Sequence, residues 1–148
     1  MARKVPDDVQ KVFDKYTVNF VRRLNKDTAL EMLAKEFKLE GARAELMFEM
    51  FDKDRNNILS AWEFYLFYAS FGYEANAYLD KYEALQGGSG SADVAGAWDF
   101  LKGLKTLSGR PFEDDELETT MKSIMGEEKV LDQKRFIELI SRIKLTRN

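Results

Sequence analysis

Oxygen-bearing side chains recur at alternate positions in one stretch of the chain, residues 52–63. They are Asp52, Asp54, Asn56 and Ser60, and the stretch closes with Glu63. A hard cation such as Ca²⁺ takes about six to eight oxygen ligands, and a tight loop that turns every second side chain inward can supply them. Glu63 can add two oxygens, Ile58 offers its backbone carbonyl, and Ser60 lies where a water usually completes the shell. The sequence therefore predicts one Ca²⁺ site, made by Asp52, Asp54, Asn56, Ile58, Ser60 and Glu63.

One residue departs from the usual pattern of such loops. The sixth position normally carries Gly, because the chain takes a left-handed conformation there, and here it is Asn57. Asn is among the least costly non-Gly residues in that conformation, so we expect the loop to close. Asn57, with Lys53 and Arg55 beside the site, is expected to weaken the affinity for calcium without abolishing it. The alternative is a polar loop between two helices that binds no metal.

Apolar residues at helical spacing flank this stretch on both sides. Phe48 and Phe51 precede it, and Phe64 and Phe67 follow it. The spacing of three predicts a helix on each side, and hence a helix–loop–helix unit.

A related unit lies about 35 residues earlier, where Phe13 and Tyr16 precede a second loop, 17–28. Leu24 falls at the same loop position as Leu59, where paired loops make a short antiparallel strand contact. The ligand positions, however, carry residues that cannot bind a cation through a side-chain carboxylate: Thr17, Val21 and Thr28, with two arginines between them. This loop is predicted to keep its fold and to bind no metal.

The second half repeats the plan in weaker form. Apolar stripes predict helices around 78–85, 94–107, 117–124 and 136–143. The intervening stretches, 86–93 and 126–132, lack alternating oxygens, and the latter is about one residue short when it is counted from Phe136. Residues 87–91 are Gly and Ser, which also suits an engineered linker. No metal site is expected in this half.

Length and composition restrict the possible classes of protein. The 148 residues suit one domain or two small ones, and the repeated plan predicts two, at 1–72 and 73–148. No stretch approaches about 18 uninterrupted apolar residues, so no membrane span is expected, and the N-terminal residues carry no apolar run typical of a signal peptide. The chain has no Cys and no His, which removes thiol chemistry and the commonest general base. A net charge of −3 indicates no nucleic-acid partner.

Repeated helix–loop–helix units with one oxygen-rich loop, 52–63, resemble the EF-hand calmodulin superfamily. The resemblance implies an all-α, calmodulin-like fold of two lobes, each a pair of EF-hand units. The match is specific at 52–63 and architectural elsewhere. Because only one loop keeps its ligands, the chain resembles a divergent myosin light chain more than calmodulin itself.

The resemblance also implies a function. Such a light chain is not an enzyme; it clamps an amphipathic IQ-type helix of a myosin heavy chain, here in an unconventional myosin, and is cytoplasmic and associated with the cytoskeleton. The alternative is a calcium sensor that exposes an apolar groove when calcium binds at 52–63. An enzyme would need a carboxylate pair or a Ser or Lys nucleophile in a cleft. Residues that could line a groove are Met32, Met47, Met50, Phe67, Leu104, Met121 and Met125.

Overall fold

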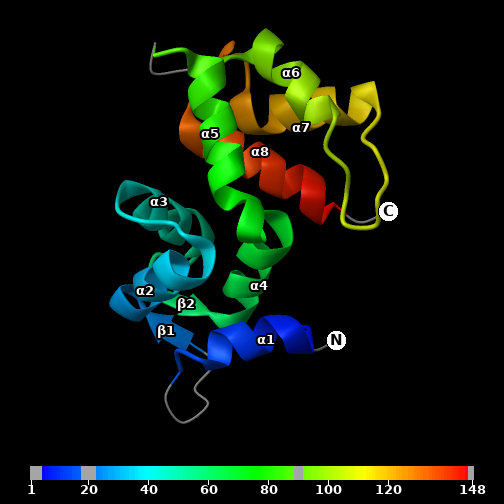
Figure 1. Cartoon of the computed structure of the whole chain (residues 1–148). Coiled ribbons are helices and arrows are strands. Elements are labelled where there is room, and N and C mark those ends of the chain that lie inside the picture. The colour runs from blue at the N-terminus through cyan, green and yellow to red at the C-terminus, as the bar shows by residue number, and fades with distance from the viewer. Residues whose placement is uncertain (1–4, 18–22, 89–91, 147–148) are drawn as a thin grey trace. The chain divides into compact units, whose positions relative to one another are not determined.

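The computed structural model describes residues 5–17, 23–88 and 92–146 (Figure 1). The chain divides into two compact units, Met1–Asn76 and Ala77–Asn148. The division falls inside helix α5 (Ala75–Gln86), whereas the sequence placed the boundary at 72/73. No helix in the described ranges is long and apolar enough to cross a lipid bilayer.

The first unit contains two helix–loop–helix pairs. Helices α1 (Asp7–Asp14) and α2 (Lys26–Phe37) form one pair, and α3 (Ala42–Phe51) and α4 (Ala61–Ser70) form the other. Strand β1 (Arg23–Asn25) pairs antiparallel with β2 (Ile58–Ser60), with Leu24 opposite Leu59. The strand contact predicted at these two leucines is thus confirmed. A 3₁₀ turn, η1 (Gly72–Glu74), leads into α5.

Local capping explains where these helices begin. The Asn25 side chain accepts a hydrogen bond from the Thr28 N–H at 2.9 Å, as a helix N-cap does. Ser60 and Glu63 form a reciprocal capping box at the start of α4. Helix α1 has no side-chain cap: Pro6 precedes it, and Asp7 and Asp8 both lie in its first turn. There the carboxylates favour the positive end of the helix dipole.

Aromatic rings form the core of the first unit. Phe64 of α4 lies 5.6 Å from Phe13, and Phe67 lies 5.0 Å from Phe37 and 5.6 Å from Phe51, between ring centroids. These five rings come from α1, α2, α3 and α4, so they join all four helices. Each phenylalanine buries a large apolar area, which makes this cluster the main source of stability in the unit.

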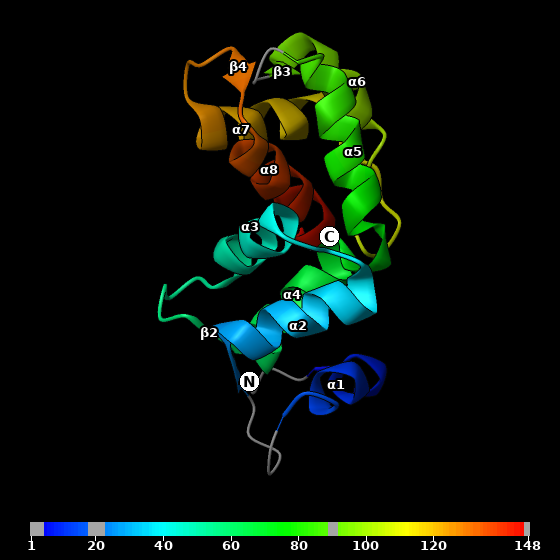
Figure 2. The ribbon, with the colours of Figure 1, turned by 60° about the vertical axis from the view of Figure 1, so that its left-hand side comes forward.

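The second unit repeats the architecture. Helix α5 pairs with α6 (Val94–Lys102), and α7 (Asp114–Met125) pairs with α8 (Gln133–Leu145). Strands β3 (Ala92–Asp93) and β4 (Val130–Leu131) pair antiparallel between them, with Ala92 opposite Leu131 (Figure 2). The fold is therefore all-α and calmodulin-like, as predicted.

The core of the second unit is more aliphatic than that of the first. Its buried apolar residues are Tyr78, Leu79, Tyr82, Ala92, Ala97, Leu101, Leu104, Phe112, Leu117, Met121, Met125, Leu131, Phe136, Ile137, Leu139, Ile140 and Ile143. The Tyr82 hydroxyl donates to the Leu131 carbonyl at 2.8 Å, which ties α5 to β4. Helix α6 ends earlier than its predicted stripe: Leu104 and Leu107 lie in the following loop, and Leu107 is 55% exposed.

The Tyr16–Glu36 contact generates a pH prediction. The Tyr16 hydroxyl donates to Glu36 at 2.7 Å, and burial together with this carboxylate raises the pKa of Tyr16 from 10.0 to about 12. Because the folded pKa lies above the unfolded one, this contribution to stability is complete below about pH 10 and is lost as the pH rises through 12. An ultraviolet difference titration of wild type against Tyr16→Phe should isolate one phenolate that forms near pH 12. A difference that titrates at pH 10 would contradict the contact.

Candidate calcium-binding loop

The loop between α3 and α4 holds the predicted site residues in two different environments. Asp52 and Glu63, at its two ends, are only 4% and 9% exposed. Asp54 and Asn56 are exposed, and Ile58 and Ser60 are half-buried. The loop therefore carries two buried carboxylates and a more accessible set of oxygens between them.

The Asp52 carboxylate uses one oxygen and leaves the other without a partner. Oδ2 accepts a hydrogen bond from the Asn57 N–H at 2.9 Å. Oδ1 is buried and has no hydrogen-bond partner among the described residues. A buried carboxylate oxygen without a partner is costly, because it has lost water and gained nothing in return. A cation beside Oδ1 would remove that cost.

The Glu63 carboxylate connects the two ends of the loop. Its Oε1 accepts the Ser60 N–H at 2.9 Å, while the Ser60 hydroxyl accepts the Glu63 N–H at 3.1 Å. Its Oε2 accepts the Lys53 N–H, also at 2.9 Å. A carboxylate offers about four lone-pair sites, so one site on each oxygen remains for a metal ion.

Backbone conformation turns the loop as the sequence predicted. Asn57 has φ 61°, in the left-handed region normally given to Gly at this position. Arg55, two residues earlier, has φ 53°. The Asn56 side chain then accepts the Ile58 N–H at 3.1 Å. Two left-handed residues so close together bend the chain sharply. The hydrogen bond from the Ile58 N–H to the Asn56 side chain then holds the backbone where it leaves the bend.

The full donor set is not assembled in this arrangement. In the described part of the chain, no group of three or more His, Cys, Asp or Glu side chains is placed to hold a metal ion. Asp52 and Glu63 are buried at the loop ends, but Asp54 remains exposed. The donor chemistry, all oxygen, and the unpartnered Asp52 Oδ1 nevertheless fit a hard cation. Binding would require the Asp54 side chain to turn inward.

Charged residues that the sequence did not connect with the site surround Asp52. An open pocket of about 280 Å³ is lined by Lys26, Glu45, Phe48, Glu49, Asp52, Arg55 and Asn57. Lys26 comes from α2 and lies 3.7 Å from Glu45 of α3, measured between Nζ and Oε1. Sequence spacing holds no signal for Lys26, because it is placed by the packing of α2 on α3. Its positive charge beside Asp52 adds to the expected weakening by Lys53 and Arg55.

The first loop uses its end residues for local structure. The Thr17 hydroxyl donates to the Asp14 carbonyl at 3.3 Å, and the Thr28 N–H is taken by the Asn25 cap. The described residues omit 18–22, so Val21 and Arg22 lie outside them, whereas Arg23 lies inside. The described part of this loop supplies no carboxylate at a ligand position. That this loop binds no metal remains a prediction from the sequence.

Both loops of the second unit are shorter than the candidate loop. Nine residues, 52–60, separate α3 from α4, whereas seven separate α5 from α6 (87–93) and α7 from α8 (126–132). The gap between helices at 126–132 is thus two residues shorter than 52–60, because α7 extends to Met125, whereas the sequence prediction of about one residue was counted from Phe136. Residues 89–91 of the Gly/Ser stretch lie outside the described ranges, so its interpretation as a linker stays untested.

The strand register shows what replaces the closing glutamate in the second unit. Glu63 stands four residues after Leu59, and the residue four after Leu131 is Arg135. Arg135 Nη1 donates to Glu128 Oε2 at 2.9 Å. Where the candidate loop has an anion to hold a metal, this loop has a cation of its own, bound to its own carboxylate. A second cation would be repelled there.

The indole rings test this difference between the units. Trp62 directly precedes Glu63, and Trp98 lies on α6 in the second unit. In Trp98→Phe protein, the fluorescence of Trp62 should respond to calcium, because the ion binds its neighbour. In Trp62→Phe protein, Trp98 should not respond. A Trp98 response of similar size would show that calcium acts on the second unit.

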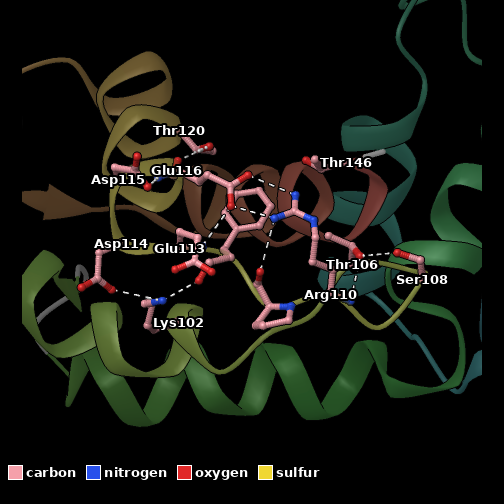
Figure 3. Close-up of polar contacts among 12 residues, drawn as sticks. Lys102, Thr106, Ser108, Arg110, Glu113, Asp114, Asp115, Glu116, Thr120 and Thr146 are labelled. Carbon is pink, nitrogen blue, oxygen red and sulfur yellow. Dashed lines mark hydrogen bonds and ion pairs between the residues drawn. The ribbon is translucent and has the colours of Figure 1, made fainter. Parts of the chain in front are cut away.

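A separate polar cluster braces the loop between α6 and α7 (Figure 3). Arg110 donates two hydrogen bonds to Glu116, at 2.7 and 3.0 Å, and Lys102 lies 3.1 Å from Asp114. Residues 114–116 form the first turn of α7. Arg110 pairs with Glu116 and Lys102 with Asp114, so we infer that the cluster supports the loop structurally.

This cluster generates a second pH prediction. The Arg110 hydrogen bonds, with the Glu113 N–H, lower the pKa of Glu116 from 4.5 to about 2. Because the folded pKa is the lower one, the contribution to stability is present above about pH 4.5 and is lost as the pH falls through 2. Arg110→Gln should move the NMR titration of the Glu116 carboxyl upward. Lys122→Gln, which removes an exposed ion pair to Glu118 in the same helix, should leave it unchanged.

A comparison with solved structures finds similar chains. The chain is similar to the solved myosin II regulatory domain of Physarum polycephalum, with 18% sequence identity and a TM-score of 0.36 over 90% of this chain and 96% of that chain. No protein-family model matches the chain, and no curated protein matches it. A likeness at this identity and TM-score carries no argument for function. The proposed function therefore rests on the loop and on the packing of the chain itself.

Proposed function

We propose that this protein is a non-enzymatic, calmodulin-like calcium-binding protein of the light-chain type, which binds one Ca²⁺ at 52–63 and attaches to an amphipathic helix of a larger protein. The observation that carries the metal site is the buried Asp52 Oδ1 without a partner, in a loop closed by Glu63. Two buried carboxylates without a cation repel each other, and a divalent ion neutralises both.

Each predicted ligand has a distinct task in this proposal. Asp52 supplies Oδ1, which needs no rearrangement, and Glu63 supplies its remaining lone pairs from the first turn of α4. Asp54 and Asn56 lie on the exposed part of the loop and would turn toward the ion. The Ile58 carbonyl would complete the shell, together with the Ser60 side chain, which would act directly or through a water. The bound ion supplies positive charge and holds α3 and α4 at a fixed angle.

The proposed partner is a basic amphipathic helix, of the IQ type found in myosin heavy chains. Helix α4 is apolar around most of its circumference. One face, with Phe64 and Phe67, is buried in the core. A second apolar stripe is half-buried and consists of Trp62, Tyr65, Leu66 and Ala69. This spacing of three and four suits contact with the apolar stripe of another helix. The Trp62 and Tyr65 rings lie 5.1 Å apart, so they present one aromatic surface. A net charge of −3 favours a basic partner.

In the sensor alternative, calcium would have to expose apolar residues that are buried in this structure. Met32, Met47 and Phe67 are at most 2% exposed, and Met121 and Met125 are also buried. No partner helix can rest on these side chains while each unit keeps this packing. Co-purification from the source cell, with and without a calcium chelator, separates the two ideas. A light chain should retain its heavy chain in both conditions, whereas a sensor should lose its partner with the chelator.

Stoichiometry and one substitution test the metal site. Isothermal calorimetry should find one calcium per chain, with an affinity in or somewhat weaker than the micromolar range of sensor sites. Glu63→Gln should weaken it by at least about tenfold, because it removes one charge and one oxygen ligand. Glu49→Gln is the matched control: it removes a carboxylate from the pocket beside Asp52 but not from the proposed shell. Equal affinities in the two variants would refute the assignment.

A further inference from the structure

The Asn76 side chain caps a helix that lies far away in the sequence. Its Nδ2 donates to the Lys38 carbonyl at 2.8 Å and to the Phe37 carbonyl at 3.4 Å. Helix α2 ends at Phe37, with Lys38 in the left-handed conformation. The last carbonyls of a helix have no partner within the helix, so a donor from elsewhere stabilises its end. Asn76, in the first turn of α5, is that donor.

Arg43 fixes the orientation of the Asn76 amide. Its Nη1 donates to Asn76 Oδ1 at 2.7 Å, and this charge-assisted bond holds the amide nitrogen toward α2. Arg43 lies in the first turn of α3. The three residues that meet here come from the end of α2, the start of α3 and the start of α5. We call Arg43 and Asn76, with the carbonyls of Phe37 and Lys38, the latch.

An aromatic contact reinforces the latch from the same side. The Tyr73 ring of η1 lies 4.9 Å from Phe37 and 5.7 Å from Tyr68 of α4. Tyr73 is 62% exposed, yet it covers the Phe37 ring that joins α2 to the core. The segment after α4 thus holds the α2–α3 connection by hydrogen bonds and by ring packing together.

The latch restrains α3 at the end opposite to the calcium loop. Asp52 is the C-cap of α3, and Arg43 is its second residue. A metal ion at Asp52 and Glu63 would act on the C-terminal end of α3. A rotation of α3 that displaced its N-terminal end would separate Arg43 from Asn76. Such a movement of α3 would therefore break the latch, whereas a metal ion at Asp52 and Glu63 would touch none of its residues.

We propose that the latch keeps the first unit closed when calcium binds, so that occupancy of the loop does not expose the aromatic core. This inference rests on the proposed function, because it concerns the consequence of metal binding at 52–63. A ligand shifts a conformational equilibrium only by its differential affinity for the two states. The hydrogen bonds of the latch stabilise the closed state alone. Calcium could therefore open the unit only if its preference for the open state exceeded this added stability.

Asn76→Ala removes both donated bonds and the acceptor for Arg43. With this variant, calcium should increase the fluorescence of a dye that binds exposed apolar surface several-fold, and calcium affinity should rise by about threefold or more, since opening no longer breaks the latch. Wild-type protein should bind calcium with little change in dye fluorescence. Asn76→Asp keeps an acceptor for Arg43 but cannot donate to the α2 carbonyls, and should resemble Asn76→Ala.

Lys35→Ala is the matched control, because it removes an exposed ion pair of 2.6 Å to Glu31 on α2 and leaves the latch intact. It should behave as wild type. A large dye response of the wild type to calcium, or equal dye responses of Asn76→Ala and wild type, would overturn the inference.

Hydrogen exchange without metal separates this inference from the proposed function. Amides of α2 and α3 should exchange faster in Asn76→Ala than in Lys35→Ala, with circular dichroism confirming that both are folded. If wild type binds no calcium but exchange accelerates, the proposed function fails and the latch remains. Unchanged exchange would refute the latch whatever the metal does.

Discussion

Two buried carboxylates at the ends of one loop govern the first unit. Asp52 ends α3 and Glu63 lies in the first turn of α4, and each is taken out of water with backbone N–H groups as its partners. Glu63 satisfies both of its oxygens in this way, but Asp52 does not. The geometry of the two helices therefore depends on how the charge at Asp52 is balanced. The proposed divalent cation would balance this charge, with the exposed Asp54 turned inward to join the buried carboxylates.

The second unit reaches the same architecture without that constraint. Its loops are two residues shorter, and Arg135 with Glu128 supplies an internal charge pair in place of a ligand and its metal. An exposed ion pair of this kind contributes little to stability. The unit depends instead on packing, above all of Phe136, Ile140 and Leu117, and on the Tyr82 hydroxyl bound to Leu131. The same arrangement of helices thus occurs with two kinds of loop. In the first unit the Glu63 carboxylate closes the loop, and in the second the Arg135–Glu128 ion pair lies in its place.

Closure of the first unit has more than one cause. Its rings join four helices, and the latch of Arg43 and Asn76 holds the connection between α2 and α3. Aromatic burial supplies most of the energy, since each ring removes a large apolar area from water, while the hydrogen bonds select the arrangement. Under the proposal above, the protein binds a metal ion and keeps its core covered. Such behaviour suits a constitutive partner of a helix better than a calcium-gated one.

The sequence alone determined the helical plan, the strand contact of Leu24 with Leu59, and the left-handed conformation of Asn57, because these follow from local spacing and backbone sterics. It also predicted six oxygen donors as one group, a prediction that the structure does not test. Only the tertiary structure decided which of them are buried, that Asp52 Oδ1 lacks a partner, and that Lys26 lies beside the site. Asn76 could not be recognised from its neighbours, since its partners stand 33 and 38 residues away. Burial and long-range hydrogen bonds depend on how the helices pack, and no local pattern encodes that packing.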